Sequence, residues 1–478
     1  MLFNSIEYAI FLPIVFLFYW FIVNKNLKLQ NLLLLAVSYI FYGWWDWRFL
    51  TLIIFSSMVD YLIGIGLEKQ QDTAKRKTLL LTSIFVNIGF LGFFKYYNFF
   101  AENFIKAFTI FGKHPDATSL NIILPVGISF YTFQTLSYSI DVYRGKFKPT
   151  KDIVAFFAFV AFFPQLVAGP IERATNLLPQ FYKKRYFEYN KAVDGMRQIL
   201  WGLFKKIVIA DNCARYTNVI FSNYSDYSGS TLVIGLLLFT FQIYGDFSGY
   251  SDIAIGTARL FGFNLMRNFA FPYFSRDIAE YWRRWHISLS SWFRDYVYIP
   301  LGGSRGSTWM KIRNTFIIFL VTGFWHGANW TFIAWGFINA CYFLPLMLIK
   351  QNRKHLDIVA EGKILPSIKE FFQMVLTFFI TYMARVFFRS ESISDAFHYI
   401  RIMFSASLLT IPSILPKRLI PAIILFVVIE WIQREKQHAL QIDNFKLPEV
   451  VKWGLYYSLI IIIIVFGGTQ QEFYYFQF

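Results

Sequence analysis

Long apolar runs without any Asp, Glu, Lys or Arg are the feature that most constrains how this chain can fold. A transmembrane helix needs about 20 mostly apolar residues. Only helices and closed barrels satisfy every backbone hydrogen bond inside lipid. The clearest charge-free runs cover residues 8–24, 78–94, 117–140, 153–171, 227–245 and 454–471. The sequence therefore predicts an all-α protein that crosses a membrane many times.

The overall composition supports a polytopic membrane protein. Only 16% of the 478 residues are charged, against about 25% in soluble domains. With weaker apolar runs added, we expect roughly 11 transmembrane helices and several re-entrant or interfacial ones. No repeat, low-complexity tract or domain-sized polar segment interrupts the chain. We therefore expect one membrane-embedded domain over residues 1–478, with the functional core at about 120–345.

The net charge of +17 fits lipid, rather than nucleic acid, as the partner. Lys and Arg gather in short loops between apolar runs, as the positive-inside rule describes. No basic stripe with interleaved aromatic residues is present, so we expect no nucleic-acid binding. Lys25 and Lys28 lie two expected crossings before the basic loop at 69–77. If these loops are cytoplasmic, the N-terminus lies outside.

A stretch at 244–335 contains the most unusual residues, beginning with His286. Within residues 281–294, a single helix would place Trp282, Trp285 and Leu289 on one arc. Arg283, His286, Ser290 and Arg294 would share the neighbouring arc. Such a helix is too polar to span hydrocarbon. It is typical of an interfacial or re-entrant position, with His286 between the dry and the wet face.

His326 lies in a different environment. Residues 314–349 contain no Asp, Glu, Lys or Arg, and this run is longer than one span needs. We expect it to break or tilt near Gly323 and Gly327, which also allow another backbone to approach closely. Thr322 and Asn329 fall on the helical face of His326. Either side chain is predicted to fix its tautomer by a hydrogen bond.

Residues 242–256 bring two carboxylates into an apolar region. Asp246 and Asp252 are functional candidates because an intramembrane carboxylate is costly, and Ser248 lies between them. The structural alternative is an ion pair with one of three arginines. Gly245 and Gly249 are spaced to permit close helix packing. The arginines available for that ion pair are Arg259, Arg267 and Arg276.

The remaining polar residues carry weaker predictions. Arg385 and Arg389 lie near an expected helix end, so we expect them to extend to the membrane interface. His355, His398 and His438 have charged neighbours and are interpreted as loop or interface histidines. Cys213 and Cys341 lack zinc-type spacing, and Cys341 lies in an apolar run, so we expect neither a disulfide nor a metal site.

Four phrases in this sequence resemble the membrane-bound O-acyltransferase (MBOAT) family, and within it the alginate O-acetyltransferase branch. They are residues 246–252 (DFSGYSD), 282–290 (WRRWHISLS), 294–303 (RDYVYIPLGG) and 324–327 (FWHG). The resemblance covers nearly the whole chain. It implies helices arranged around a central tunnel, with His326 as the family's intramembrane histidine and His286 as the second functional histidine.

The resemblance also implies an activity. It implies transfer of an acetyl group from a cytoplasmic donor, acetyl-CoA, to an extracytoplasmic polysaccharide, such as an alginate-like exopolysaccharide or a cell-wall glycan. A partner acetyltransferase of the SGNH type is expected, in a bacterial cytoplasmic membrane. No bound cofactor or metal is expected. Candidate substrate or tunnel residues are Asp246, Ser248, Asp252, Arg283, Ser290, Arg294, Thr322 and Asn329.

The residues themselves fit acyl transfer. The reaction needs a base for a hydroxyl proton and donors for the oxyanion. A buried imidazole has its pKa lowered and stays neutral, so His326 is the expected base and His286 its assistant. D-alanyl transfer to teichoic acid and transport of a lipid-linked sugar remain alternatives. No Gly-x-Ser-x-Gly motif lies near either histidine, so a serine nucleophile is not indicated.

Overall fold

A computed structural model describes residues 1–110, 120, 122–443, 447–468 and 470–474. Within these ranges the chain forms α-helices, short 3-10 and π turns and irregular connecting segments, and no strand occurs in them. The all-α prediction is therefore confirmed. Residues 117–119 and 121 of the apolar run 117–140, and residue 469 of the run 454–471, lie outside the described residues.

By its internal contacts the chain divides into two compact units. Among the described residues, the first unit contains those of 1–192 and 257–266, and the second contains those of 193–256 and 267–474. The helices of the first unit are α1 (Ile6–Leu17), α2 (Leu27–Asp46), α3 (Leu50–Lys69), α4 (Thr73–Leu91), α5 (Tyr97–Ile110), α6 (Ile128–Tyr143), α7 (Ile153–Ala161), α8 (Phe163–Leu166) and α9 (Ala174–Leu177).

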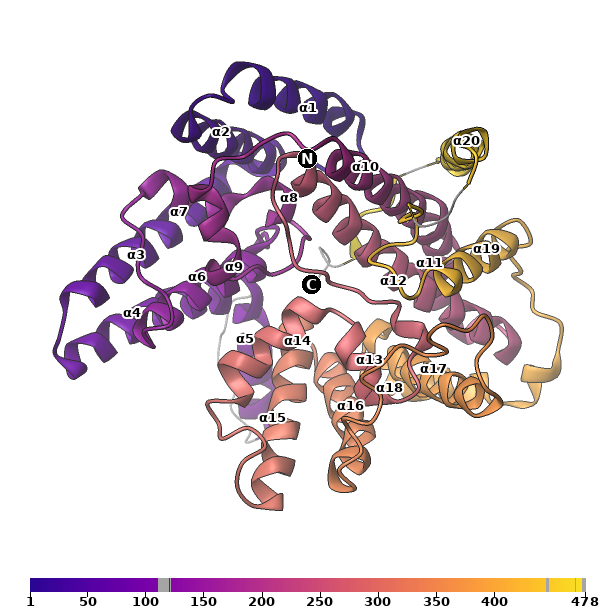
Figure 1. Cartoon of the computed structure of the whole chain (residues 1–478). Helices are drawn as coiled ribbons and strands as arrows, with labels where there is room; N and C mark the ends of the chain where they lie inside the picture. The colour runs from indigo at the N-terminus through magenta and orange to yellow at the C-terminus, as the bar shows by residue number, and fades with distance from the viewer. Residues whose placement is uncertain (111–119, 121, 444–446, 469, 475–478) are drawn as a thin grey trace. The chain divides into compact units, whose positions relative to one another are not determined.

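A buried polar network joins α3, α4 and α6, which lie side by side in the first unit (Figure 1). Asp60 of α3 is fully buried and accepts hydrogen bonds from Ser83 and Ser139. Asn87 Nδ2 donates to its other carboxylate oxygen at 2.7 Å. Asn87 Oδ1 in turn accepts from Thr135 at 3.0 Å. This network satisfies polar groups that lipid could not.

Replacing Asp60 by Ala is expected to destabilise the protein by about 1–3 kcal/mol for each donor left unsatisfied. Asp60→Asn keeps one acceptor oxygen and should cost less. The measurement is the unfolding midpoint of the purified protein in detergent. Thr51→Ala removes an exposed hydroxyl from the same helix and serves as the control. Equal midpoints for Asp60→Ala and the control would show that the network does not stabilise the fold.

The second unit contains the stretch that the sequence singled out. α10 (Tyr189–Leu203) enters this unit from the first, and α12 (Gly229–Leu260) returns to the first at its end. Its other helices are α11 (Asp211–Ser222), α13 (Ile278–Arg284), α14 (Ile287–Phe293), α15 (Thr308–His326), α16 (Trp330–Leu348), α17 (Ile368–Arg389), α18 (Ile393–Met403), α19 (Leu419–Ile432) and α20 (Glu449–Phe466).

The predicted break in the run 314–349 occurs at Gly327. α15 ends at His326 and α16 begins at Trp330, and the two helices pack as a hairpin (Figure 1). Gly323 remains within α15, where an added Cβ would lie 2.3 Å from the carbonyl oxygen of Phe332. Only glycine permits this contact, so the prediction of close backbone approach is confirmed.

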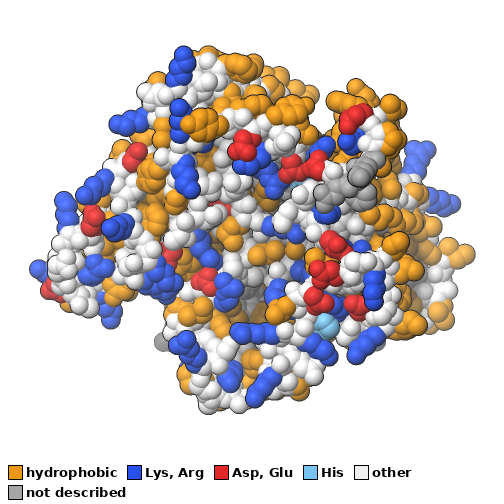
Figure 2. Space-filling view, viewed as in Figure 1, with side chains coloured by type: hydrophobic (Ala, Val, Ile, Leu, Met, Phe, Trp, Pro, Cys, Tyr) orange, Lys and Arg blue, Asp and Glu red, His pale blue; other side chains and the backbone are white. Residues whose placement is uncertain are grey.

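Within the described residues, six helical segments are long and apolar enough to cross a membrane, and three apolar helices are shorter. The chain is a polytopic membrane protein, while the count of 11 spans stays a prediction. Figure 2 shows hydrophobic side chains gathered over α19 and α20. The six segments are Leu27–Lys69, Thr73–Thr109, Gly229–Leu260, Trp330–Leu348, Ile368–Arg389 and Glu449–Phe466.

Candidate functional site

His326 is the last residue of α15, directly before the break at Gly327. Its side chain is 3% exposed. The imidazole packs edge-on against Trp335 of α16 and Phe388 of α17, with ring centroids 5.1 and 5.2 Å away. The imidazole at the end of α15 therefore lies in an aromatic enclosure, and this enclosure excludes bulk water from the ring.

His286 occupies a turn, which corrects the prediction of one helix over residues 281–294. α13 ends at Arg284, Trp285 is extended, and α14 begins at Ile287. His286 itself has φ +44°, in the left-handed region. The helical arc assigned to Arg283, His286 and Ser290 therefore does not exist.

Asn268, in the segment between α12 and α13, holds this turn in place. Its carbonyl oxygen accepts from the backbone N–H of Ile287 at 2.9 Å. Its side-chain oxygen accepts from the Ser288 hydroxyl at 2.9 Å, and its Nδ2 donates to Ser251 of α12 at 3.0 Å. Sequence reasoning missed Asn268, because no local pattern marks a partner about twenty residues away.

One indole contacts both histidines. The Trp325 ring centroid lies 5.9 Å from that of His286 and 4.9 Å from that of His326. The His286 ring also packs against Phe247 of α12 at 4.5 Å and stacks on Phe269 at 6.3 Å. The two histidines that the sequence selected thus share one buried aromatic layer.

Burial lowers the pKa of His286, which lies outside the candidate spans, to about 3. Because its folded pKa lies below its unfolded value, protonation of the unfolded chain destabilises the fold as the pH falls. Between about pH 7.5 and about pH 5.5 this should cost about 1.4 kcal/mol of unfolding free energy. His286→Asn should lose less stability over the same interval, as measured by denaturation in detergent.

Buried carboxyls, Glu172 among them, change stability in the opposite direction, and their effect must be separated from that of His286. Burial raises the pKa of the Glu172 carboxyl to about 7, so its contribution falls as the pH rises above its unfolded value. Glu172 is present in both proteins, so its effect cancels in the difference between them. Identical pH profiles for the two proteins would contradict the burial of a neutral His286.

Asp246 and Asp252 form ion pairs, but their partners are lysines and not the three arginines considered. Lys206 Nζ lies 2.7 Å from Asp246 and 2.8 Å from Asp211. Lys205 Nζ lies 2.6 Å from Asp252. Both lysines belong to the π-helical turn η5 (Phe204–Ala210).

Gly245 and Gly249 allow α12 to approach this turn. An added Cβ would lie 3.0 Å from the Lys205 carbonyl oxygen at Gly245 and 2.8 Å from the Gly202 carbonyl oxygen at Gly249. The close packing predicted from their spacing is confirmed. It is this approach that places both lysines against the carboxylates of α12.

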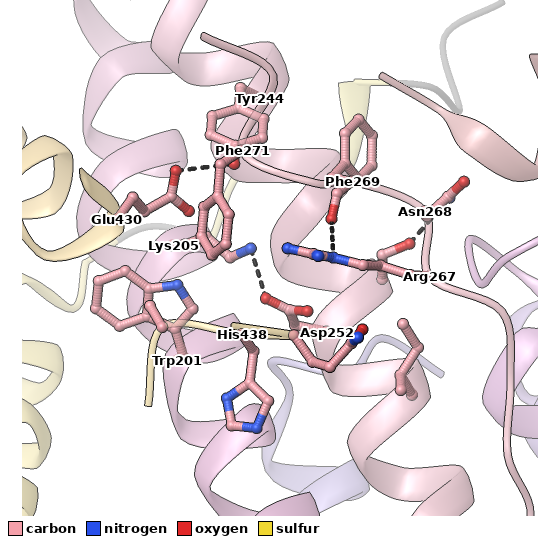
Figure 3. Close-up of a pocket in the computed structure, with 14 residues that line it drawn as sticks. Trp201, Lys205, Tyr244, Asp252, Arg267, Asn268, Phe269, Phe271, Glu430 and His438 are labelled. Atoms are coloured by element: carbon pink, nitrogen blue, oxygen red, sulfur yellow. Dashed lines mark hydrogen bonds and ion pairs between the residues drawn. The ribbon is translucent and has the colours of Figure 1, made fainter. Parts of the chain in front are cut away.

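A small polar cavity surrounds the Lys205–Asp252 pair (Figure 3). Its volume is about 10 Å³, room for one water molecule. Tyr244 donates to Glu430 at 2.8 Å in its wall. His438, interpreted from sequence as an interface histidine, is 2% exposed and also lines this cavity, with Nε2 2.9 Å from Asp194.

The side chains of Arg283, Arg294 and Ser290 have partners other than the two imidazoles, and the Ser290 backbone N–H donates to the His286 carbonyl oxygen at 3.0 Å. Arg283 donates to the carbonyl oxygens of Asn352 and His355, and Arg294 pairs with Asp295 on an exposed turn. These contacts stabilise loops. The hydroxyl of Ser290 donates to the Trp285 carbonyl oxygen at 3.3 Å.

Thr322 and Asn329 were expected to fix the tautomer of His326, and the structure gives them other partners. Thr322 donates to the Ile318 carbonyl oxygen within its own helix. Asn329 caps α16 by accepting from the Thr331 N–H, and donates to the Glu391 carbonyl oxygen. Helical capping therefore uses the polar atoms of Asn329.

Ser248 follows Phe247 in α12. Its side chain is 1% exposed, and in the described part of the chain its hydroxyl has no hydrogen-bond partner. The roles of all these residues stay predictions.

Arg385 is buried, contrary to the prediction that it extends to the interface. It is 4% exposed, and Nη2 donates to the Tyr281 hydroxyl at 2.8 Å. Its guanidinium lies over the Tyr273 and Trp285 rings at 5.2 and 5.3 Å. A position near the end of an apolar helix suggested extension, and only tertiary packing reveals the aromatic surroundings.

Comparison with known proteins identifies related sequences. The model of the membrane-bound O-acyltransferase family, MBOAT, matches residues 39–387. A probable alginate O-acetylase, AlgI, of Pseudomonas aeruginosa is 41% identical over 84% of this chain and 74% of that protein. A peptidoglycan O-acetyltransferase of Helicobacter pylori is 34% identical over 81% and 76%. A teichoic acid D-alanyltransferase of Bacillus subtilis is 28% identical over 46% and 60%.

Proposed function

Because the chain belongs to the membrane-bound O-acyltransferase family and is an O-acyltransferase, we propose that it acetylates an extracytoplasmic polysaccharide. Two relatives named for O-acetyl transfer to alginate and peptidoglycan match over more than four-fifths of this chain. The D-alanyltransferase matches under half of it. This difference favours the acetyl group over D-alanine.

The proposed reaction starts from a cytoplasmic thioester, acetyl-CoA. The acceptor hydroxyl loses its proton to His326 as its oxygen bonds to the acetyl carbon. The carbon–sulfur bond then breaks, and the proton passes to the departing thiolate, so the reaction releases no net proton. His286 assists by positioning or by stabilising charge. The observation that carries this proposal is the burial of both imidazoles against one indole, Trp325.

The setting of the reaction is also proposed. The chain would lie in a bacterial cytoplasmic membrane with its N-terminus outside, because its basic loops then face the cytoplasm. An SGNH-type acetyltransferase outside the membrane would complete delivery to the polysaccharide, and the helices would surround a tunnel for the acetyl group. A single functional domain with its core at about 120–345 belongs to this proposal.

The test uses purified full-length protein in lipid nanodiscs with radiolabelled acetyl-CoA. We expect release of free coenzyme A thiol and transfer of label to a hydroxyl acceptor, with neither from empty nanodiscs. A D-alanyltransferase would instead require a D-alanyl thioester. A sugar transporter would release no thiol from either donor, and that result would overturn the proposal.

A further inference from the structure

A second small cavity lies in the same unit, beside the enclosure of His326. Its volume is about 20 Å³, enough for one or two water-sized groups. Trp335 and Phe388 form part of its wall, and the same two rings contact His326. The remaining wall includes Trp282 and Arg385. The cavity therefore shares two side chains with the imidazole proposed as the base.

Arg385 brings a buried positive charge to this cavity. It belongs to α17, one of the candidate membrane spans. Among the residues that the structure describes, no carboxylate forms an ion pair with it, and its polar contact is the Tyr281 hydroxyl. Charged side chains inside a membrane ordinarily pair or serve a function, because burying a lone charge is costly.

Two hydrogen-bond donors in the cavity wall remain unused. In the described ranges neither Arg385 Nη1 nor Trp282 Nε1 has a hydrogen-bond partner, and both atoms are buried. A guanidinium and an indole N–H donate and never accept. The residues that line the cavity therefore carry two unused donors and one positive charge, which is the chemistry that recognises an oxygen carrying negative charge.

We propose that this cavity holds the acyl oxygen of the thioester, with Arg385 Nη1 and Trp282 Nε1 as its donors. This inference rests on the proposed function. When the acceptor hydroxyl adds to the acetyl carbon, the carbonyl oxygen takes the electron pair of the C=O π bond. It returns that pair when the thiolate leaves. Arg385 keeps its proton throughout and stabilises the negative charge between these two events.

The size of the cavity fits this role. Room for one or two water-sized groups is enough for the acyl oxygen that the cavity is proposed to hold. Aromatic walls keep bulk water away, which strengthens a hydrogen bond from a charged donor. Donors fixed before the reaction need no rearrangement as charge develops.

The test compares two non-reactive donor analogues that differ by one oxygen. S-acetonyl-CoA carries a ketone next to a methyl group, and S-propyl-CoA has a methylene in place of that ketone. Wild-type protein in nanodiscs should bind the ketone about 10-fold to 100-fold more tightly, as expected for a hydrogen bond from a charged donor. Arg385→Gln should lose most of this preference, with unchanged affinity for S-propyl-CoA, because the Trp282 N–H remains as a neutral donor.

Kinetics supply a second measurement. Arg385→Gln should lower kcat for acetyl transfer about 100-fold or more, with KM changed only a few-fold, since the donor acts on the transition state. Arg385→Lys should recover part of kcat, because it restores the charge without the planar fork. Trp282→Phe keeps an aromatic ring and should lose part of the ketone preference.

Arg389→Gln is the matched control, with the same chemical change one turn further along α17. Arg389 lies outside the cavity wall and donates to Asn218 at 2.9 Å. This variant should keep the ketone preference and kcat. Thermal midpoints of all variants show whether each is folded, and Trp282→Phe tests the cavity even where Arg385→Gln is unfolded.

The outcomes separate this inference from the proposed function. If wild-type protein releases no thiol from acetyl-CoA and binds neither analogue, the proposed function fails. If wild-type protein transfers acetyl but folded Arg385→Gln and Trp282→Phe both retain the ketone preference, the assignment of the cavity is overturned. Equal loss of both analogues in folded Arg385→Gln would also overturn it, because Arg385 would then support binding of coenzyme A and not of the acyl oxygen.

Discussion

His326→Ala is expected to lower the rate of acetyl transfer by about 100-fold to 10,000-fold, the range that a well-placed general base supplies. His326 is the last residue of α15 and lies in an aromatic enclosure. In the described chain, His286 is the only other imidazole that contacts the same indole, Trp325. Alanine leaves the helix end intact, so the protein should still fold. The measurement is thiol release from acetyl-CoA by purified variants in nanodiscs.

His398→Ala provides the matched control for this experiment. His398 is exposed and lies against Tyr224, so its removal deletes an imidazole without touching the aromatic layer. It should leave the rate unchanged. A folded His326→Ala protein with near-wild-type turnover would refute the assignment of His326 as the base.

Lys206→Met is expected to lower stability by about 3–5 kcal/mol, because it removes one partner of a buried charge cluster. Asp246 and Asp211 would then remain buried without their cation. The same lysine donates to the Gln471 carbonyl oxygen, and Asp246 accepts from the Tyr474 N–H, so the segment at 470–474 would also loosen. Denaturant unfolding and protease sensitivity of that segment measure both effects.

Lys191→Met is the control, because it removes a lysine whose side chain is exposed, whereas that of Lys206 is buried. Lys191 pairs with Glu188 at 2.7 Å, and both side chains are more than half exposed. Such surface pairs contribute about 0–1 kcal/mol. The double variant Lys206→Met with Asp246→Asn should recover part of the stability, because less charge is left unpaired. Similar unfolding curves for the Lys206 and Lys191 variants would rule out a stabilising cluster.

Features set by local backbone chemistry could be predicted from the sequence. The helical break at Gly327 and the close approach at Gly323 follow from glycines inside an apolar run. The all-α class follows from the absence of charge over lengths that match a membrane. These predictions needed no knowledge of which helices are neighbours.

Features set by distant partners could not be predicted. Nothing local marks a turn at His286, since residues 281–294 contain no glycine or proline, and the contacts that fix the turn come from Asn268. The partners of Asp246 and Asp252 lie on η5, about forty residues earlier. The sequence indicated that the carboxylates need cations, but only packing selects which cations are near.

In the candidate site, too, some residues could be predicted from the local sequence and others could not. His286 and His326 were selected by residue type and surroundings, and the structure brings both to Trp325. Arg385 was missed because an arginine near a helix end ordinarily reaches the interface. Its burial among Tyr273, Tyr281 and Trp285 depends on the packing of α13 and α17.

The left-handed φ of +44° at His286 affects how any alanine scan of this protein is interpreted. Alanine disfavours that conformation, so His286→Ala removes the imidazole and strains the peptide chain at once, whereas asparagine adopts it more readily. Glycine adopts it with no steric penalty. Comparing Asn, Gly and Ala at position 286 therefore separates the effect of losing the imidazole ring from the effect of straining the backbone.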